Sequence, residues 1–337
     1  MSTNDATVPV PGTSTSISRK VRGAIASIAG VSGLVALIAV FWALEPDTFG
    51  TTDNFKLIIS QASVAAILAA GLSVSLTAGA FDLSFGAVMA GGGVLVAGLL
   101  TNAGFGPLPA IVVTIAAGVG FGAINGLLVA YGRLPSLIAT LGTQSILAGI
   151  LVWATSSVAV DIDRDSSFNQ IARGDWLGVP REAWIMLVLV GIGWGVSRQT
   201  IVGRNLTAVG RNPDAAHLAG IPVRRYVVGA LAVTAAFAAC AGILTAAKLS
   251  AGRPEVGAAL LLPTFAAAFL GAAVSRDGTF NMPGAVLGAL MLTTITNGLV
   301  IISAPDWTYE VVTGAVLLLA VGLSRLVRGG AAVSGAP

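Results

Sequence analysis

Long continuous runs of apolar residues, separated by short polar breaks, constrain this chain more than any other feature. A helix needs about 20 apolar residues to cross a bilayer, and only helices and closed barrels satisfy their backbone hydrogen bonds there. A barrel would show alternating segments of about ten residues. The predicted spans cover residues 23–44, 57–79, 84–101, 108–131, 136–157, 183–197, 226–247, 258–274, 284–303 and 308–326. We therefore predict an all-α fold, a polytopic transmembrane helical bundle of about ten spans.

The composition agrees with a membrane protein and excludes several other classes. Apolar residues make up 55% of the chain, charged residues only 10%, and the mean hydropathy is +0.89, whereas a soluble domain carries about 25% charged residues. So little polar surface excludes a soluble globular enzyme and a disordered protein. One Cys and one His exclude an internal disulfide, a Cys/His zinc site and a CxxC redox motif. We predict no metal site and no cofactor.

The distribution of basic residues predicts the orientation in the membrane. The first run follows a basic cluster that begins at Arg19, and its apolar core is longer than that of a signal peptide. We interpret it as an uncleaved first helix. With the N-terminus inside, the inner segments hold 12 of the 18 basic residues and 4 of the 15 acidic ones. Because Lys and Arg accumulate on the cytoplasmic side, we predict an N-in/C-in topology, with cytosolic tails at 1–22 and 329–337 around a transmembrane domain over 23–328.

The outer of two long polar loops covers about residues 158–182. It is long enough to cap the outer mouth or contact a partner, and it is equally compatible with a solvated connector. Asp161, Asp163 and Asp165 have the spacing that begins a calcium loop, but the central Gly and the Glu at the twelfth position are missing. We therefore exclude calcium at this site.

The inner loop, residues 198–225, predicts a short helix over 213–219 with signals at both ends. Asn212 is a good N-cap and Pro213 suits the first helical position. Gly220 suits a left-handed C-cap, and His217 favours the helix dipole near the C-terminus. A structured turn with snorkelling arginines is one interpretation, and a docking helix for a cytoplasmic protein is the one we favour, because so short an exposed helix is marginal unless something packs on it. The predicted contact residues are Asn212, Pro213, Asp214, Ala215, Ala216, His217, Leu218 and Gly220.

Polar residues within the spans are few, and Asp82 is the main ionisable one. Gly79 and Gly86 bracket it, so we expect a helix break where its carboxylate caps the next helix through the N–H of Ser84 or Phe85. A substrate or gating role is the alternative. The uncharged polar residues are compatible with interhelical hydrogen bonds or with a pathway for a neutral polar solute. The candidate pathway residues are Gln61, Asp82, Ser84, Asn125, Thr140, Thr143, Gln144 and Asn297.

The chain lacks the residues that several other classes of membrane protein require. An ion-coupled carrier normally needs buried carboxylates or broken-helix ion sites, a channel needs a filter or a charged ring, and an enzyme needs a nucleophile–base set or metal ligands. A P-loop requires GxxxxGK[ST], and the chain contains no Gly-Lys dipeptide. A docking helix without an ATP site in the same chain predicts a separate ATPase chain.

Five segments resemble the membrane permease subunit of ribose-type (monosaccharide) bacterial ABC importers. They are AFDLSFGAVMAGGG (80–93), NGLLVAYGRLPSLIATLGTQSI (125–146), VGRNLTAVGRNPDAAHLAGI (202–221), FLGAAVSRDGTFNMPGAVLGAL (269–290) and TNGL (296–299). The resemblance extends over about residues 20–328. Its motifs are individually loose, and Ala80-Phe81 replaces the usual Gly-Ile, but their order is specific.

The resemblance implies a multi-pass protein of the cytoplasmic membrane without enzymatic activity, built from ten spans in two inverted halves. It also implies a second permease subunit in a homo- or heterodimer, two cytosolic ATP-binding subunits docked on 212–220, and an extracytoplasmic sugar-binding protein. Membrane lipid is the remaining predicted partner, and nucleic acid is excluded. A branched-chain amino acid or nucleoside ABC permease is the nearest alternative. An ion-coupled secondary carrier is another, which Asp82→Asn would inactivate, and a structural scaffold is a third.

Overall fold

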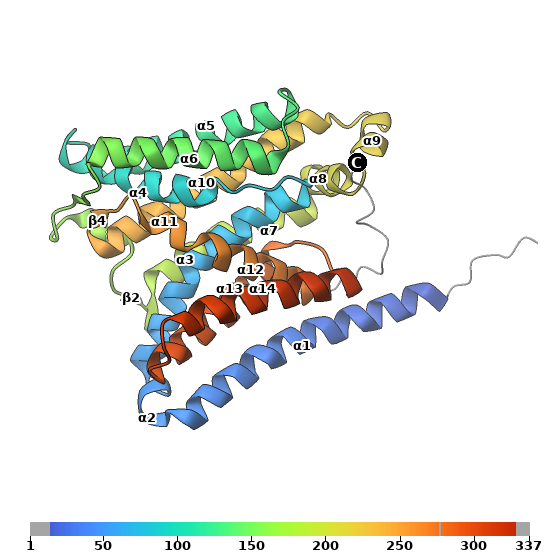
Figure 1. Cartoon of the computed structure of the whole chain (residues 1–337), viewed down its shortest axis with the longest axis horizontal. Coiled ribbons are helices and arrows are strands. Elements are labelled where there is room, and N and C mark those ends of the chain that lie inside the picture. The colour runs from blue at the N-terminus through green and yellow to red at the C-terminus, as the bar shows by residue number, and fades with distance from the viewer. Residues whose placement is uncertain (1–13, 276–277, 328–337) are drawn as a thin grey trace, which may run out of the picture.

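A computed structural model describes residues 14–275 and 278–327, with side chains for 28–322 in this range. Nine of the ten predicted spans each overlap one long helix, and the span at 258–274 covers two helices, α11 and α12. The helices are α1 (Ser14–Leu44), α2 (Pro46–Phe49), α3 (Thr52–Thr77), α4 (Phe85–Thr101), α5 (Pro107–Ala130), α6 (Ser136–Thr155), α7 (Arg181–Gln199), α8 (Ile201–Arg211), α9 (Pro213–Leu218), α10 (Val223–Leu249), α11 (Val256–Ala259), α12 (Leu261–Ala273), α13 (Met282–Ile301) and α14 (Trp307–Val327). The predicted all-α polytopic fold is therefore confirmed (Figure 1).

The number of membrane crossings stays a prediction. Among the described residues, six helices are long and apolar enough to cross a membrane, or seven if α7 and α8 form one bent span. Three shorter apolar helices, at Ile28–Leu44, Phe85–Thr101 and Trp307–Gly322, bring the candidates to nine, or to the predicted ten if α7 and α8 count as one span. The N-in/C-in orientation also stays a prediction. Helix α1 starts earlier than the predicted span, and residues 1–13 and 329–337 of the two predicted tails lie outside the described residues.

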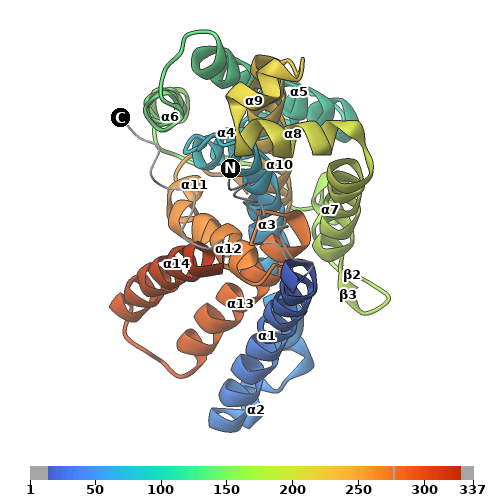
Figure 2. The same cartoon turned by 90° about the vertical axis from the view of Figure 1, so that its right-hand side faces the viewer.

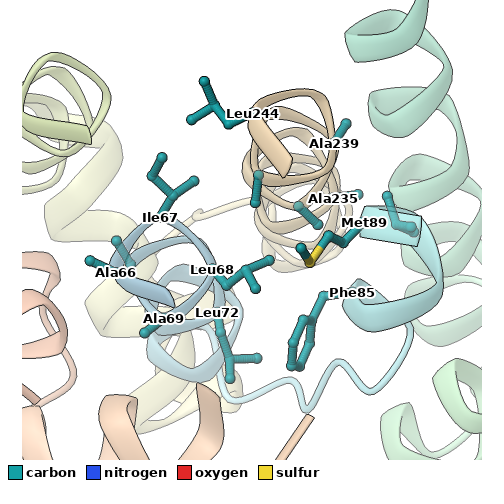
Figure 3. Packing of buried hydrophobic residues seen from close by; sticks show 14 of the residues in the cluster. Ala66, Ile67, Leu68, Ala69, Leu72, Phe85, Met89, Ala235, Ala239 and Leu244 are labelled. Carbon is teal, nitrogen blue, oxygen red and sulfur yellow. The ribbon is translucent and has the colours of Figure 1, made fainter. Parts of the chain in front are cut away.

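The core of the bundle is the crossing of α3 and α10, which Figure 2 shows surrounded by the other helices. Gly71 brings the two backbones together, because a Cβ built there would lie 2.5 Å from the Cβ of Phe237. The Thr234 hydroxyl donates to the carbonyl of Gly71 across this contact at 2.9 Å. Aliphatic and aromatic side chains of α3, α4 and α10 fill the neighbouring space, among them Leu68, Phe85 and others labelled in Figure 3. The buried threonine adds a hydrogen bond to a contact made mainly by packing.

Helix α5 packs along α10 through three glycines at four-residue spacing, Gly118, Gly122 and Gly126. A Cβ at Gly126 would lie 2.5 Å from the Cα of Val228, and one at Gly118 would lie 2.8 Å from the Cβ of Ala239. Such small-residue spacing lets helices approach closely in a membrane. The three glycines of α5 thus serve close helix packing.

The outer loop is folded at one end of the bundle, opposite α8 and α9 (Figure 1). Strand β1 (Val160–Asp161) pairs antiparallel with β4 (Ala251–Gly252), and β2 (Asp175–Trp176) pairs with β3 (Val179–Pro180). Between them lies the 3-10 helix η1 (Ser167–Ile171), which buries Phe168. This structure is more ordered than a plain solvated connector, while a capping or docking role stays a prediction.

The inner loop contains one helix more than the sequence predicts. Helix α8 continues from α7 after a bend of 75° at Thr200. It buries Gly203, Leu206 and Val209, which lie three residues apart and therefore share a face. Sequence analysis missed α8 because charged residues on its other face give it the polarity of a loop.

Candidate functional sites

Helix α9 has the caps that the sequence predicts. The Asn212 side chain accepts a hydrogen bond from the N–H of Ala215 at 2.9 Å, and Pro213 occupies the first turn. At the other end Gly220 has a φ of +79°, a left-handed conformation that suits glycine. Its N–H donates to the carbonyl of His217 at 2.9 Å, and the next N–H, of Ile221, donates to Ala216 at 3.0 Å. These are the bonds of a glycine C-cap, so the predicted helix is confirmed, ending one residue early.

The capped helix is exposed on nearly all of its surface. Ala216 is buried, whereas Asp214, Ala215 and His217 are exposed and Leu218 is 88% exposed. Helix α9 rests mainly on α8, and the Asn205 side chain ties α8 to α10 by donating to the Tyr226 hydroxyl at 2.8 Å. Leu218 is therefore an exposed apolar side chain on a helix that is capped at both ends.

A second candidate site lies in the non-helical connection between α3 and α4. Asp82 and Ser84 are fully buried there. One carboxylate oxygen of Asp82 accepts from the Ser84 N–H at 2.8 Å and from the Ser84 hydroxyl at 2.6 Å. The Asn125 amide of α5 donates to that hydroxyl at 2.7 Å. The predicted bond from Asp82 to a following N–H is present, but α4 begins at Phe85 with Ser84 at its N-cap, so Asp82 lies two residues before the cap position that the sequence predicts for it.

Helix α6 completes this polar cluster. The Thr140 hydroxyl accepts from the N–H of Leu83 at 3.0 Å, and the Ser136 hydroxyl accepts from the N–H of Phe81 at 3.1 Å. These bonds satisfy backbone groups that the helix break leaves open. The second carboxylate oxygen of Asp82 and the amide oxygen of Asn125 have no hydrogen-bond partner among the described residues. Four candidate pathway residues, which come from three segments, therefore form one buried cluster.

Of the remaining candidate pathway residues, Thr143 contacts the cluster through Thr140, and Asn297 lies in a separate contact. The Thr143 hydroxyl donates to the carbonyl of Thr140 at 3.1 Å, and Gln144 follows on α6 with a buried amide oxygen that lacks a described partner. Asn297 on α13 donates to the side chain of Asn54 on α3 at 2.9 Å. That bond joins two packed helices, which is the interhelical role considered for such residues.

Gln61 lines a cavity of about 290 Å³ between α3, α4 and the helices from α10 to α14. The walls are mostly apolar, and they include Met89 and Leu292. The polar groups are mainly neutral, among them Thr245, Thr296 and Tyr309. A mostly apolar cavity with a few polar groups is the usual form of a small-molecule site.

Sequence analysis missed a charged group beside this cavity. Lys248, a cavity residue in the last turn of α10, donates to the Ser60 hydroxyl and lies 3.4 Å from the Glu182 carboxylate. The Ser60 hydroxyl in turn donates to Glu182 at 2.8 Å. Glu182 is buried, with 3% of its side chain exposed. These residues come from α3, α7 and α10, so no local pattern in the sequence indicates that they meet.

Comparison with known proteins identifies the class. Residues 54–321 match the family described as branched-chain amino acid transport system / permease component. The chain therefore belongs to this family of membrane permease components. Its apolar helices and its relatives make it a multi-pass protein of the cytoplasmic membrane.

Within this family the chain is similar to sugar permeases. It is 33% identical to the ribose import permease protein RbsC of Escherichia coli K12 over 86% of this chain and 90% of the relative. It is 31% identical to the D-allose transport system permease protein AlsC of the same organism, over 87% and 90%. It is 28% identical to the L-arabinose ABC transporter permease protein AraH of Azospirillum brasilense, over 90% and 89%. The resemblance to ribose-type permeases is confirmed, and the chain is a homologue of sugar ABC permeases.

Proposed function

We propose that this protein is the transmembrane subunit of an ATP-driven importer that moves a monosaccharide into the cell by alternating access. Two copies, or one copy and a paralogue, form the membrane part. Two separate ATP-binding subunits dock on residues 212–220, and an extracytoplasmic sugar-binding protein delivers the substrate at the opposite end. The chain crosses the membrane ten times in two inverted halves, with both termini in the cytosol.

The observation that carries this proposal is the exposed, doubly capped α9. A conformational change driven by ATP hydrolysis on another chain must reach the membrane helices through a contact surface that is rigid. Caps at Asn212 and Gly220 supply that rigidity, and Leu218 supplies an apolar anchor without a use inside the subunit. The separate ATPase also agrees with the absence of a Gly-Lys dipeptide from the sequence.

The substrate class is supported by the relatives and by the cavity. The named sugars of the three relatives are ribose, D-allose and L-arabinose, which are all neutral and rich in hydroxyl groups. The polar groups around the cavity, including Gln61, Thr245 and Thr296, are mainly neutral donors and acceptors. Such groups form hydrogen bonds with the hydroxyls of a sugar but bind it only weakly, as a transport pathway requires. We propose Gln61 as a pathway residue on this basis, and the Asp82 cluster as a second polar step.

Leu218→Glu tests the docking proposal. The chain is co-expressed with an ATP-binding subunit from the same genome, and association is measured by co-purification and titration. Because an exposed anchor contributes about 2 kcal/mol to binding, we expect association to weaken about thirtyfold. Leu177→Glu is the matched control, since Leu177 is 93% exposed at the opposite end of the bundle. Equal association of the two variants would refute docking on α9.

Uptake by whole cells tests the substrate class. Labelled ribose, D-allose and L-arabinose are compared with leucine and adenosine in cells with and without the intact gene. Gene-dependent uptake of a monosaccharide supports the proposal. Gene-dependent uptake of leucine or adenosine alone would instead favour an amino acid or nucleoside permease.

A further inference from the structure

The connection between α5 and α6 contains Tyr131 and Arg133, and it meets the first turn of α10, which contains Arg224 and Arg225, through a contact of Arg224 with Tyr131. The Arg224 guanidinium lies over the ring of Tyr131, 5.3 Å from its centre. Arg225 follows directly in α10, and Arg133 lies two residues after Tyr131. All four side chains are exposed. The cation–π contact holds one guanidinium in place, so the positive charge is concentrated at a defined position.

This charge has no compensation within the described chain. None of the three arginines forms an ion pair with any residue that the structure describes. The first turn of α10 contains no acidic residue, and Pro222 provides no side-chain cap. A helix N-terminus already carries partial positive charge, which makes two arginines in this turn unfavourable on their own. An anion from outside the chain would remove this conflict.

Exposed apolar residues continue from the arginines along both helices. On α5, Ile124 and Leu127 share a face with Tyr131, and all three are about half exposed. On α10, Gly229 and Val233 follow Arg225 at four-residue spacing and are exposed. A Cβ built at Gly229 would meet no atom within 4 Å.

The two apolar stripes lie on the same side of the helix pair. Helices α5 and α10 pack with Gly126 against Val228 and Gly118 against Ala239, so they run antiparallel. On each helix, the stripe is rotated about the helix axis from the line of contact by roughly a quarter to a half of a turn, in the direction in which the chain winds. Because the two helices run antiparallel, this rotation turns both stripes toward the same side of the pair.

We propose that this side of α5 and α10 binds an anionic phospholipid. The headgroup phosphate lies among Arg133, Arg224 and Arg225, and an acyl chain runs along Leu127, Gly229 and Val233. The continuous apolar stripe favours a lipid over a soluble acidic protein, because it gives the acyl chain a contact that a hydrophilic partner would not use. In the predicted orientation the site faces the cytoplasmic leaflet, where basic residues between transmembrane helices hold acidic headgroups.

Lipid binding to the purified full-length chain tests the proposal. The chain is prepared in a neutral detergent and titrated with dioleoyl phosphatidylglycerol, with dioleoyl phosphatidylcholine and with sn-glycerol 3-phosphate, and the bound species are counted by native mass spectrometry. We expect tight binding of phosphatidylglycerol only. Since each arginine near the headgroup contributes about a fivefold gain in affinity, Arg224→Gln with Arg225→Gln should weaken binding about thirtyfold.

Two further variants keep the test decisive. Replacing both arginines by lysine preserves the charge and should retain binding within a few-fold, which separates loss of charge from loss of fold. Arg164→Gln removes an exposed arginine from the outer loop and should leave binding unchanged. The proposal is overturned if the glutamine variant binds phosphatidylglycerol like the wild type, or if phosphatidylcholine or glycerol 3-phosphate binds equally well. It is also overturned if the glutamine pair keeps lipid binding but loses an ATP-binding subunit, since the surface then serves a protein.

Discussion

The two ends of the bundle differ in whether they contain ion pairs. Both ion pairs among the described residues, Lys56–Asp175 and Lys248–Glu182, lie at the end that carries the outer loop. There Arg173 also donates to the carbonyl of Lys248, at 3.1–3.2 Å. At the opposite end the arginines of α8 and of the first turn of α10 are exposed and form no ion pair with a described residue. Two lysines of the outer end therefore pair with carboxylates, although Asp161, Asp163 and Arg164 of the same end are exposed and form no ion pair, whereas no described residue at the inner end forms one.

This difference indicates where the subunit depends on partners. An unpaired arginine on a surface costs little in water, so the inner end is stable without an internal partner and remains available for acidic surfaces and lipids. The outer end must hold a loop of about 25 residues in place. The loop is held by the pairing of short strands, by the ion pair of the buried Glu182 carboxylate with Lys248, and by hydrogen bonds from Arg173 to a backbone carbonyl.

The largest effect is expected from Lys248→Met at the outer end. It leaves the buried Glu182 carboxylate without its cation, a change that costs about 3–5 kcal/mol in a dry interior. Because the Lys248 side chain is 35% exposed, water screens part of this cost, and we expect a loss of about 2–3 kcal/mol in unfolding experiments in detergent. The double variant with Glu182→Gln should recover at least half of the loss. No recovery would show that Lys248 stabilises this end by packing alone.

A smaller effect is expected from Asn212→Ala at the inner end. Loss of the side-chain cap should destabilise α9 by about 1 kcal/mol, which is seen as faster hydrogen exchange of the amides that follow. Global melting should hardly change, because α9 contributes only Ala216 to the interior. Thr51→Ala is the matched control, since Thr51 caps the central α3 by accepting from Asn54 at 3.2 Å. That variant should lower the melting temperature, and equal global effects of the two variants would contradict the contrast between the ends.

The smallest effect is expected from Lys56→Ala at the outer end. Its ion pair with Asp175 is short, at 2.6 Å, but both side chains are about one-third exposed. Exposed pairs contribute little and are screened by salt. We expect a slight drop in melting temperature at low ionic strength and none in concentrated salt. A drop that persists in salt would show that this pair holds the loop as firmly as the Lys248 pair does.

Local sequence was sufficient to predict α9. Asn212, Pro213 and Gly220 act on backbone groups within three residues, so their effect does not depend on the rest of the fold. The same holds for the bond from Asp82 to the N–H of Ser84. Sequence analysis missed helix α8 because only three of its residues are buried. The polar residues on its other face lower the mean hydropathy of the segment to that of a loop.

The contacts between distant segments were not predictable. The sequence presents Ser84, Asn125 and Thr140 as separate polar residues and does not indicate that they form one cluster with Asp82. Glu182 falls in the predicted outer loop, 66 positions before Lys248, and nothing near either residue indicates that they pair. Side chains that meet through packing of whole helices carry no signal in their own neighbourhood, whereas caps and turns do.

By itself the sequence determined the membrane-protein class, the ten long apolar segments, the caps of α9 and the uneven distribution of basic residues, since each follows from hydropathy, charge or backbone chemistry over a few residues. The tertiary structure decided which polar side chains meet. It buried Asp82 with its partners, placed Gln61 on a cavity, paired Lys248 with Glu182, and left Arg224 unpaired beside Tyr131. These outcomes depend on the close approach of α3, α5 and α10 at their glycines, and that geometry exists only once the helices have packed.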